Sequence, residues 1–257
     1  MVAVSHRDAD NFIVSAPASI DVYLIFGTDI GLVYERSCNI LKNLGFEPRD
    51  PEQVLRLDGD AVSVDPGLLF DETHTTGLFS SKRSILMRAG TRQILSPVEL
   101  ALSEPSPDCK IVIQAGALRK DAPLRSLVTR ARNGAAIECY PDQARDIERL
   151  VETELKSAGL KIEAKARNVL VGLLGDDRLS TRAELEKLIL FAHGQQQITE
   201  AQVIEAVADA SAFAQDSIVY AAFSGKLAVL GEEGASLYRS GSEVAALMAA
   251  GQRHLYM

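Results

Sequence analysis

The sequence predicts an α/β protein in which residues 1–140 form a parallel sheet covered by helices on both faces. Short, nearly continuous apolar runs alternate here with segments in which apolar residues recur at helical spacing. Strands that read as uninterrupted apolar runs are typical of parallel sheets buried on both faces. After Tyr140 the strand-like runs stop and only helical patterns follow, so we expect a second, all-helical region.

The strand and helix signals of the first region follow one another in strict alternation. Short apolar runs rich in branched residues predict five strands: Val22–Phe26, Val54–Leu57, Ser84–Met87, Lys110–Gln114 and Ala136–Cys139. Helical spacing of apolar residues predicts the segments between them as helices: Tyr34–Leu44, Asp65–Thr76, Ile94–Ser103 and Ala122–Arg132. Gly45 follows the first of these helices, as glycine commonly does at a helix C-terminus.

Helical signals fill the rest of the chain. Residues 141–211 are predicted as a compact module without strands, with helices over Ala144–Ser157 and Glu163–Leu174. Two further helices are predicted to open at Thr181 and Thr199, because each begins a capping-box pattern. Residues 212–257 are predicted to hold shorter helices: Ser217–Phe223, Lys226–Leu230, Gly234–Tyr238 and Glu243–His254.

Charge, cysteine content and the length of apolar runs argue against several classes of function. The 257 residues include 27 Lys plus Arg and 35 Asp plus Glu, a net charge of -8, which argues against tight sequence-independent binding to duplex DNA. Cys38, Cys109 and Cys139 form no C-x-x-C pair, which argues against a disulfide framework or a zinc site. The N-terminus lacks a signal-peptide pattern, and no apolar run approaches the roughly 18 residues of a membrane span. We expect a cytoplasmic protein without membrane contact.

The loop after the first strand is where a P-loop protein would bind phosphate. Such a site needs a glycine-rich turn, a lysine for the phosphates and a Ser or Thr for magnesium. This loop has Gly27 and Gly31, but Leu32 and Val33 follow, and Asp29 adds a negative charge. We interpret the loop as a degenerate phosphate loop that does not bind nucleotide, with its glycines present mainly for steric reasons.

Other catalytic constellations are missing from the sequence. The strand Ser84–Met87 runs into Arg88 rather than into an acidic pair that would hold magnesium. The four histidines show no i, i+4 pairing, and no G-x-S-x-G motif is present. We therefore predict no catalytic residue, no metal ligand and no cofactor. The basic residues Arg119, Lys120, Arg125, Arg130 and Arg132 are interpreted first as a solvated helix face, with contact to a polyanion as the alternative.

One segment, Gly77–Arg83, fits neither strand alternation nor a helical stripe. Leu78 and Phe79 stand side by side between small and charged residues. They either cap the core at a helix–strand junction or form an exposed apolar tip that inserts into a pocket of a partner.

Four further motifs stand, in chain order, at Val22–Asp29, Gly77–Leu86, Ile111–Lys120 and in the segment from Asp176 to Leu188, which includes Glu184-Leu185-Glu186-Lys187-Leu188. Together they resemble the motifs of one family, the delta subunit of the bacterial DNA polymerase III clamp loader. Each motif is weak alone, whereas four in the right order are fairly specific. The resemblance extends over nearly the whole chain.

The resemblance implies an AAA+-like sheet domain over 1–140, a helical lid over 141–211 and the start of a helical collar over 212–257. It implies a non-catalytic part of the DNA polymerase III holoenzyme, a DNA-directed DNA polymerase (nucleotidyltransferase) complex. Such a subunit binds and opens the sliding clamp, the beta subunit, with Leu78 and Phe79 at the position of the apolar wedge. Other loader subunits would be bound through the collar and would bind the ATP, and DNA would be contacted only indirectly or weakly.

The collar segment departs from the family, because residues 212–257 are fewer than a family collar needs, which puts loader assembly in doubt. There are two alternatives to the hypothesis of a clamp-binding subunit. One is a divergent P-loop ATPase with an atypical loop. The other is a sibling loader subunit, although such siblings usually carry a zinc module or a Ser-Arg-Cys motif where Ala115-Gly116-Ala117 stands here.

Overall fold

The computed structural model describes residues 2–6, 8–75, 82–175, 177–207, 218–226, 230, 248, 251 and 252. The chain divides into two compact units. The first comprises Met1–Asp142 together with the short segment Asp176–Leu179, and the second comprises Gln143–Gly175 and Ser180–Met257. Each unit is described below by itself.

The first unit is a parallel sheet of six strands in the order β1-β6-β2-β5-β4-β3, and every neighbouring pair is parallel. The strands are β1 (Val2–Val4), β2 (Val22–Gly27), β3 (Val54–Asp58), β4 (Arg83–Arg88), β5 (Cys109–Ala115) and β6 (Gly134–Cys139). The helices are α1 (Ala9–Val14), α2 (Ile30–Asn43), α3 (Gly59–Val64), α4 (Gly67–His74), α5 (Leu95–Ser103) and α6 (Pro123–Arg130). The predicted α/β class and parallel sheet are confirmed.

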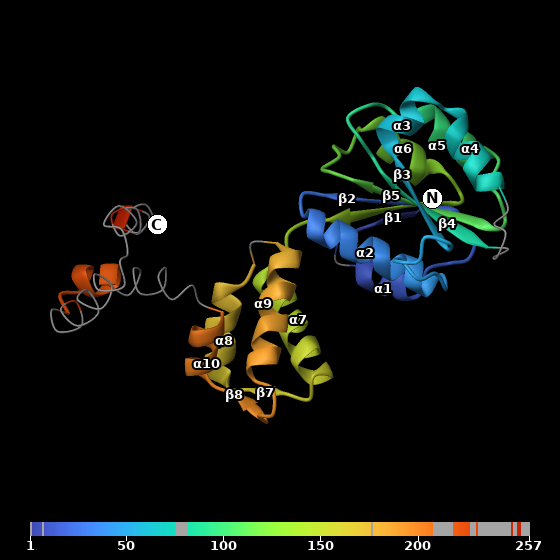
Figure 1. The fold of residues 1–257 in the computed structure, drawn as a ribbon. Coiled ribbons are helices and arrows are strands. Elements are labelled where there is room, and N and C mark those ends of the chain that lie inside the picture. Colours follow the sequence, from blue (N-terminus) through green and yellow to red (C-terminus); the bar gives the residue numbers. More distant parts are fainter. Residues whose placement is uncertain are drawn as a thin grey trace. The chain divides into compact units, whose positions relative to one another are not determined.

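Helices cover both faces of this sheet, as Figure 1 shows for the unit drawn in blue and green. On one face α1 and α2 pack on a cluster that includes Tyr23, Ile25 and Val112. On the other face α3, α4, α5 and α6 pack on a cluster that includes Leu24 and Met87. The alternation of the two clusters along each strand explains the continuous apolar runs, because residues of both parities are buried.

The start of the chain was not predicted to be structured, yet β1 pairs with β6 and α1 packs beside α2. A buried arginine on α2, Arg36, fixes this segment. Its Nε atom lies 3.1 Å from Asp10 Oδ1, and its Nη2 atom donates to the carbonyl of His6. Its Nη1 atom donates to the carbonyl of Glu138 at the end of β6. One side chain thus joins α1, α2 and β6.

The second unit contains α7 (Ala144–Ser157), α8 (Ala164–Leu173), α9 (Arg178–Phe191) and α10 (Glu200–Ala206), although the first two residues of α9 belong to the first unit. The helices bury a common core whose members include Leu150, Leu170, Leu188 and Val203. The capping box predicted at Thr199 is confirmed, since Gln202 and Thr199 satisfy each other's backbone groups.

Two expectations for this unit are wrong. The prediction of a module without strands fails, because β7 (Lys161–Ile162) and β8 (Gln197–Ile198) form a short parallel pair. The prediction that a helix opens at Thr181 also fails, because α9 begins three residues earlier, at Arg178, and Thr181 is buried within it. Of the helices predicted in 212–257, residues 218–223 are helical, and most of the rest lies outside the described residues.

Candidate functional site

The loop between β2 and α2 holds a carboxylate where a P-loop would hold phosphate. Asp29 is the N-cap of α2, it is 4% exposed, and its Oδ1 atom accepts a hydrogen bond from the backbone N–H of Leu32 at 2.8 Å. The first N–H groups of a helix are its natural anion-binding donors. An internal anion therefore occupies part of this donor set, and the Leu32 side chain that follows is buried in the core.

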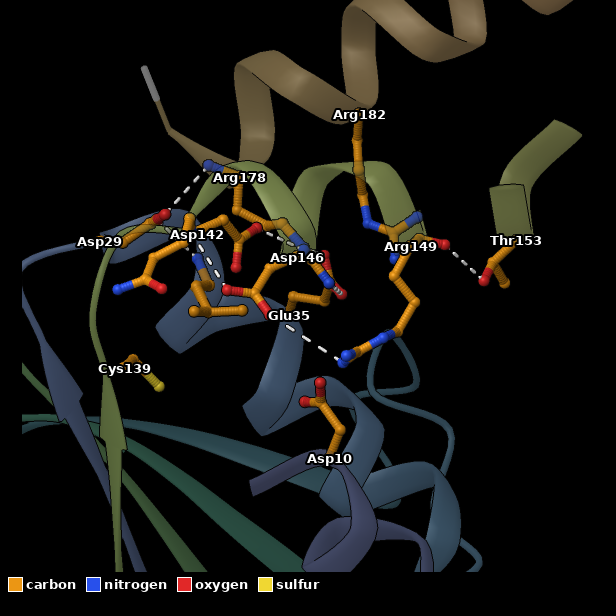
Figure 2. Close-up of polar contacts among 12 residues, drawn as sticks. Asp10, Asp29, Glu35, Cys139, Asp142, Asp146, Arg149, Thr153, Arg178 and Arg182 are labelled. Carbon is orange, nitrogen blue, oxygen red and sulfur yellow. Dashed lines mark hydrogen bonds and ion pairs between the residues drawn. The ribbon is translucent and has the colours of Figure 1, made fainter. Parts of the chain in front are cut away.

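The same carboxylate binds a segment from much later in the chain. The Oδ2 atom of Asp29 accepts a hydrogen bond from the backbone N–H of Arg178 at 3.1 Å. The guanidinium of Arg178 forms a fork on Glu35, with Nε and Nη2 each 3.2 Å from a carboxylate oxygen, and its Nη1 atom pairs with Asp142. Figure 2 shows Arg178 reaching between these acidic residues. We call Asp29, Glu35, Asp142 and Arg178 the arginine clasp.

The charges of the arginine clasp are shielded from water. The side chains of Arg178, Glu35 and Asp142 are 11%, 14% and 9% exposed. Burial by itself lowers the pKa of Arg178, but hydrogen bonds to Glu35 and the charges of Glu35 and Asp142 outweigh it and raise that pKa above its ordinary value. Arg178 therefore remains charged at every pH at which the protein would be studied.

The two loop glycines have steric reasons to be there. A Cβ atom on Gly27 would lie 1.6 Å from the carbonyl oxygen of Cys139 on the neighbouring strand β6. A Cβ atom on Gly31 would lie 2.8 Å from the backbone N of Leu179 and 2.9 Å from its Cγ atom. Close packing against β6 and against the segment Asp176–Leu179 accounts for both glycines without a phosphate.

Replacing Gly31 by alanine is expected to destabilise the protein by about 1–3 kcal/mol, the usual effect of overpacking a close contact. The new methyl group would push against backbone atoms of Leu179, which cannot move aside as a flexible side chain would. Urea unfolding followed by circular dichroism measures the change. Gly116→Ala is the matched control, because a Cβ atom there meets nothing within 4 Å. Equal stability of the two variants would contradict the steric role.

No acidic pair stands at the carboxyl end of β4. That strand ends in Arg88, whose register partners are Asp58 on β3 and Gln114 on β5. Asp58 is committed to capping α3, because its Oδ1 atom accepts the backbone N–H of Asp60 at 2.8 Å. The carboxyl end of β4 thus brings together a cation, an amide and a carboxylate that caps a helix.

Leu78 and Phe79, the predicted clamp-binding residues, lie outside the described residues, but both flanks of their segment are described. On one side α4 carries Glu72, and on the other β4 opens with Arg83. The Nη2 atom of Arg83 lies 2.9 Å from Glu72 Oε2, and both side chains are partly buried. This ion pair joins the two ends of the segment 76–81.

Of the predicted basic residues, Arg125 is not on a solvated face. It pairs with Glu138 on β6, and its guanidinium lies 4.9 Å from the ring centroid of Phe26. Arg119 lies 3.4 Å from Asp121, with both side chains largely exposed. Arg130 and Arg132 are exposed as predicted.

The decisive comparison concerns the sheet unit, where the family profile for "DNA polymerase III, delta subunit" matches residues 23–139. This chain carries a DNA polymerase III delta subunit domain. The delta domain thus begins in β2 and ends with β6, and it includes the loop between β2 and α2 and the segment of Leu78 and Phe79.

Solved structures agree with this assignment at the level of the fold. The Bacillus subtilis DNA clamp loader delta protein (YqeN) matches with a TM-score of 0.64 and 16% identity, over 96% of this chain and 75% of that chain. The Thermotoga maritima RuvB Holliday junction branch migration motor matches with a TM-score of 0.51 and 9% identity, over 84% and 76%. The comparison with curated proteins found no match. The delta domain therefore has the AAA+-like fold that the sequence predicted.

Within the described residues, no helix combines the length and the apolar character needed to cross a membrane.

Proposed function

We propose that this chain is a clamp-loader delta subunit that binds and opens the sliding clamp of the replicative DNA polymerase without hydrolysing ATP itself. The match to the delta subunit family supports a clamp-loader role. The arginine clasp supports the proposal that this subunit leaves ATP binding to other subunits. At the start of α2 the backbone N–H of Leu32 donates to Asp29, and the second oxygen of Asp29 accepts the backbone N–H of Arg178. Under this proposal the other loader subunits bind and hydrolyse the ATP.

The proposal places clamp binding on Leu78 and Phe79, supported by their position in the delta domain and by the resemblance of the surrounding motif. A few well-packed residues near the centre of an interface usually supply most of its binding energy, and the proposal assigns this role to Leu78 and Phe79. The loader partners, contacted through residues 212–257, and a weak or indirect contact with DNA belong to the same proposal.

A binding experiment with a purified beta-type sliding clamp tests this function. We expect the chain to retain the clamp in a pull-down and in surface plasmon resonance, without added nucleotide. The alternative, a divergent P-loop ATPase, predicts micromolar affinity for ATP or ADP and hydrolysis by the isolated chain. Calorimetric titration with Mg-ATP distinguishes the two, because micromolar binding would contradict the proposed delta function.

The ion pair between Glu72 and Arg83 is expected to support clamp binding by holding the ends of the segment 76–81 together. Glu72→Arg or Arg83→Glu alone places like charges side by side, and we expect each to weaken clamp binding by about three- to tenfold, on the order of 1 kcal/mol. The double variant with exchanged charges restores an attractive pair and should recover most of the affinity. Surface plasmon resonance measures all three variants, and equal affinities would contradict the positioning role.

A further inference from the structure

The sheet unit has a cavity at the carboxyl ends of β3, β4 and β5. It has a volume of about 580 Å³, and α2 forms one wall. Parallel α/β sheets bind ligands outside the carboxyl ends of strands, where neighbouring strands lead to opposite faces. Here β2 and β5 are such neighbours, because β2 leads into α2 on one face and β5 leads towards α6 on the other.

The charge lining this cavity is entirely positive, in contrast to the net charge of -8 of the chain. Arg56 on β3 and Arg88 on β4 line it, and no acidic residue does. Arg56 pairs in register with Leu86, two residues before Arg88. Adjacent strands are ~4.8 Å apart and two residues advance ~6.7 Å, so the two Cα atoms lie about 8 Å apart. The guanidinium groups can therefore face one ligand.

Hydrogen-bond donors in this cavity lack partners. Within the described part of the chain, Arg88 has no side-chain partner, and Arg56 uses only Nη2, which donates to the carbonyl of Pro48 at 3.2 Å. The Nε2 atom of Gln114, whose side chain also lines the cavity, is buried without a partner among those residues. A small rotation of that terminal amide, whose torsion is broad, would turn its N–H groups to a ligand acceptor. A buried amide without a partner is unfavourable, so an acceptor there would be stabilising.

Apart from Tyr34, the other side chains that line the cavity are apolar. Ile30 and Val33 come from α2, Leu57 and Leu86 from the strands, and Leu179 from the segment held by the arginine clasp. Ligand pockets of a few hundred Å³ typically combine such apolar walls with a few convergent polar groups.

We propose that this cavity binds a small organic phosphate monoester. Its phosphate dianion would accept hydrogen bonds from Arg56, Arg88 and Gln114, and its organic part would contact the apolar wall. Arginine suits this role because its planar fork matches phosphate oxygens. The first turn of α2 contributes only apolar wall, and its Leu32 N–H is not among the proposed phosphate donors, because Asp29 already accepts it. It requires neither magnesium nor a triphosphate, and it goes beyond the clamp-binding function.

Phenyl phosphate is the probe for this proposal, with inorganic phosphate and phenol as its two halves. We expect phenyl phosphate to bind with a millimolar dissociation constant and to shift the backbone amide resonances of Ala89 and Gly116, which line the cavity, in ¹⁵N-edited NMR titrations. Each half should bind at least about fivefold more weakly, because it makes only one kind of contact. Higher salt should weaken phenyl phosphate binding.

Arg88→Ala tests the anion contact, because Arg88 is exposed and its loss should leave the melting temperature nearly unchanged. We expect about a tenfold or larger loss of phenyl phosphate affinity, the scale of one charge-assisted hydrogen bond. Arg130→Ala is the matched control, since it removes the same charge from an exposed position of α6 outside the cavity.

Three results would overturn the proposal: no binding at 10 mM phenyl phosphate (roughly the weakest affinity of interest), equal loss in both arginine variants, or phenol binding as well as phenyl phosphate. Absence of binding would exclude the site. Equal loss in both arginine variants would show that only the net charge of the protein matters. Equal binding of phenol would show that the cavity recognises only the apolar part of the ligand. Clamp binding is measured separately and does not depend on any of these outcomes.

Discussion

Replacing Leu78 and Phe79 together by alanine is expected to abolish binding to the sliding clamp while leaving thermal stability nearly unchanged. Burying the two side chains in a partner contributes about 3–6 kcal/mol, at about 1.5–3 kcal/mol each. Their loss therefore predicts at least a roughly 100-fold weaker complex. Surface plasmon resonance with immobilised clamp measures the affinity, and differential scanning calorimetry measures the melting temperature of the same preparations.

The chain offers a closely matched control for this experiment. Leu190 and Phe191 at the end of α9 are also an adjacent Leu–Phe pair, and they are 75% and 44% exposed. Alanine at both positions removes the same apolar atoms from a surface that the proposal does not assign to the clamp. We expect unchanged clamp affinity for this variant. If the Leu78/Phe79 variant instead loses many degrees of melting temperature, the pair belongs to the core of the sheet unit.

Replacing Arg178 by alanine is expected to destabilise the protein by about 3–5 kcal/mol, the usual result of removing one partner of a buried ion pair. Glu35, Asp142 and Asp29 would keep their negative charges in a shielded site without the guanidinium. Arg178→Lys keeps the charge but loses the fork on Glu35, so an intermediate loss is expected. Urea unfolding of all variants measures these differences.

Arg182→Ala is the control for the arginine clasp. Its guanidinium pairs with Glu154, but both side chains are about one-third exposed, so a loss of at most ~1 kcal/mol is expected. A second test uses Glu35→Gln in the Arg178→Ala background, which removes one uncompensated charge and should recover part of the stability. The clasp would be energetically unimportant if Arg178→Ala lost no more stability than Arg182→Ala.

The sequence predicted the inner strands well because burial on both faces leaves a local signal. Val22–Phe26 is apolar at every position, and the structure places it at the centre of the sheet. The edge strand β1 is also apolar, but its three residues are too few to predict a strand. The pair of β7 and β8 was also missed, because two-residue strands are defined by a partner 36 positions away, as Lys161 is from Gln197, rather than by their own sequence.

The sequence pointed to the candidate site but not to its partners. Gly27, Gly31 and the charge of Asp29 predict a loop that does not bind nucleotide, and this stays a prediction. The partner of that charge could not be found from the sequence, because Arg178 lies 149 positions from Asp29. The capping-box pattern at Thr181 also predicted a helix that starts later than Arg178, where α9 begins.

The two edges of the sheet bear on how the molecule avoids self-association. Strands at an open edge present unpaired backbone groups that can recruit another chain, and proteins blunt them by shortness or by charge. At one edge β1 has only three residues. At the other, β3 exposes Arg56 and Asp58. A substitution of Arg56 would therefore also remove a charge that opposes pairing of the sheet edge with another chain. Arg88 lies on the interior strand β4, so its substitution tests ligand binding alone.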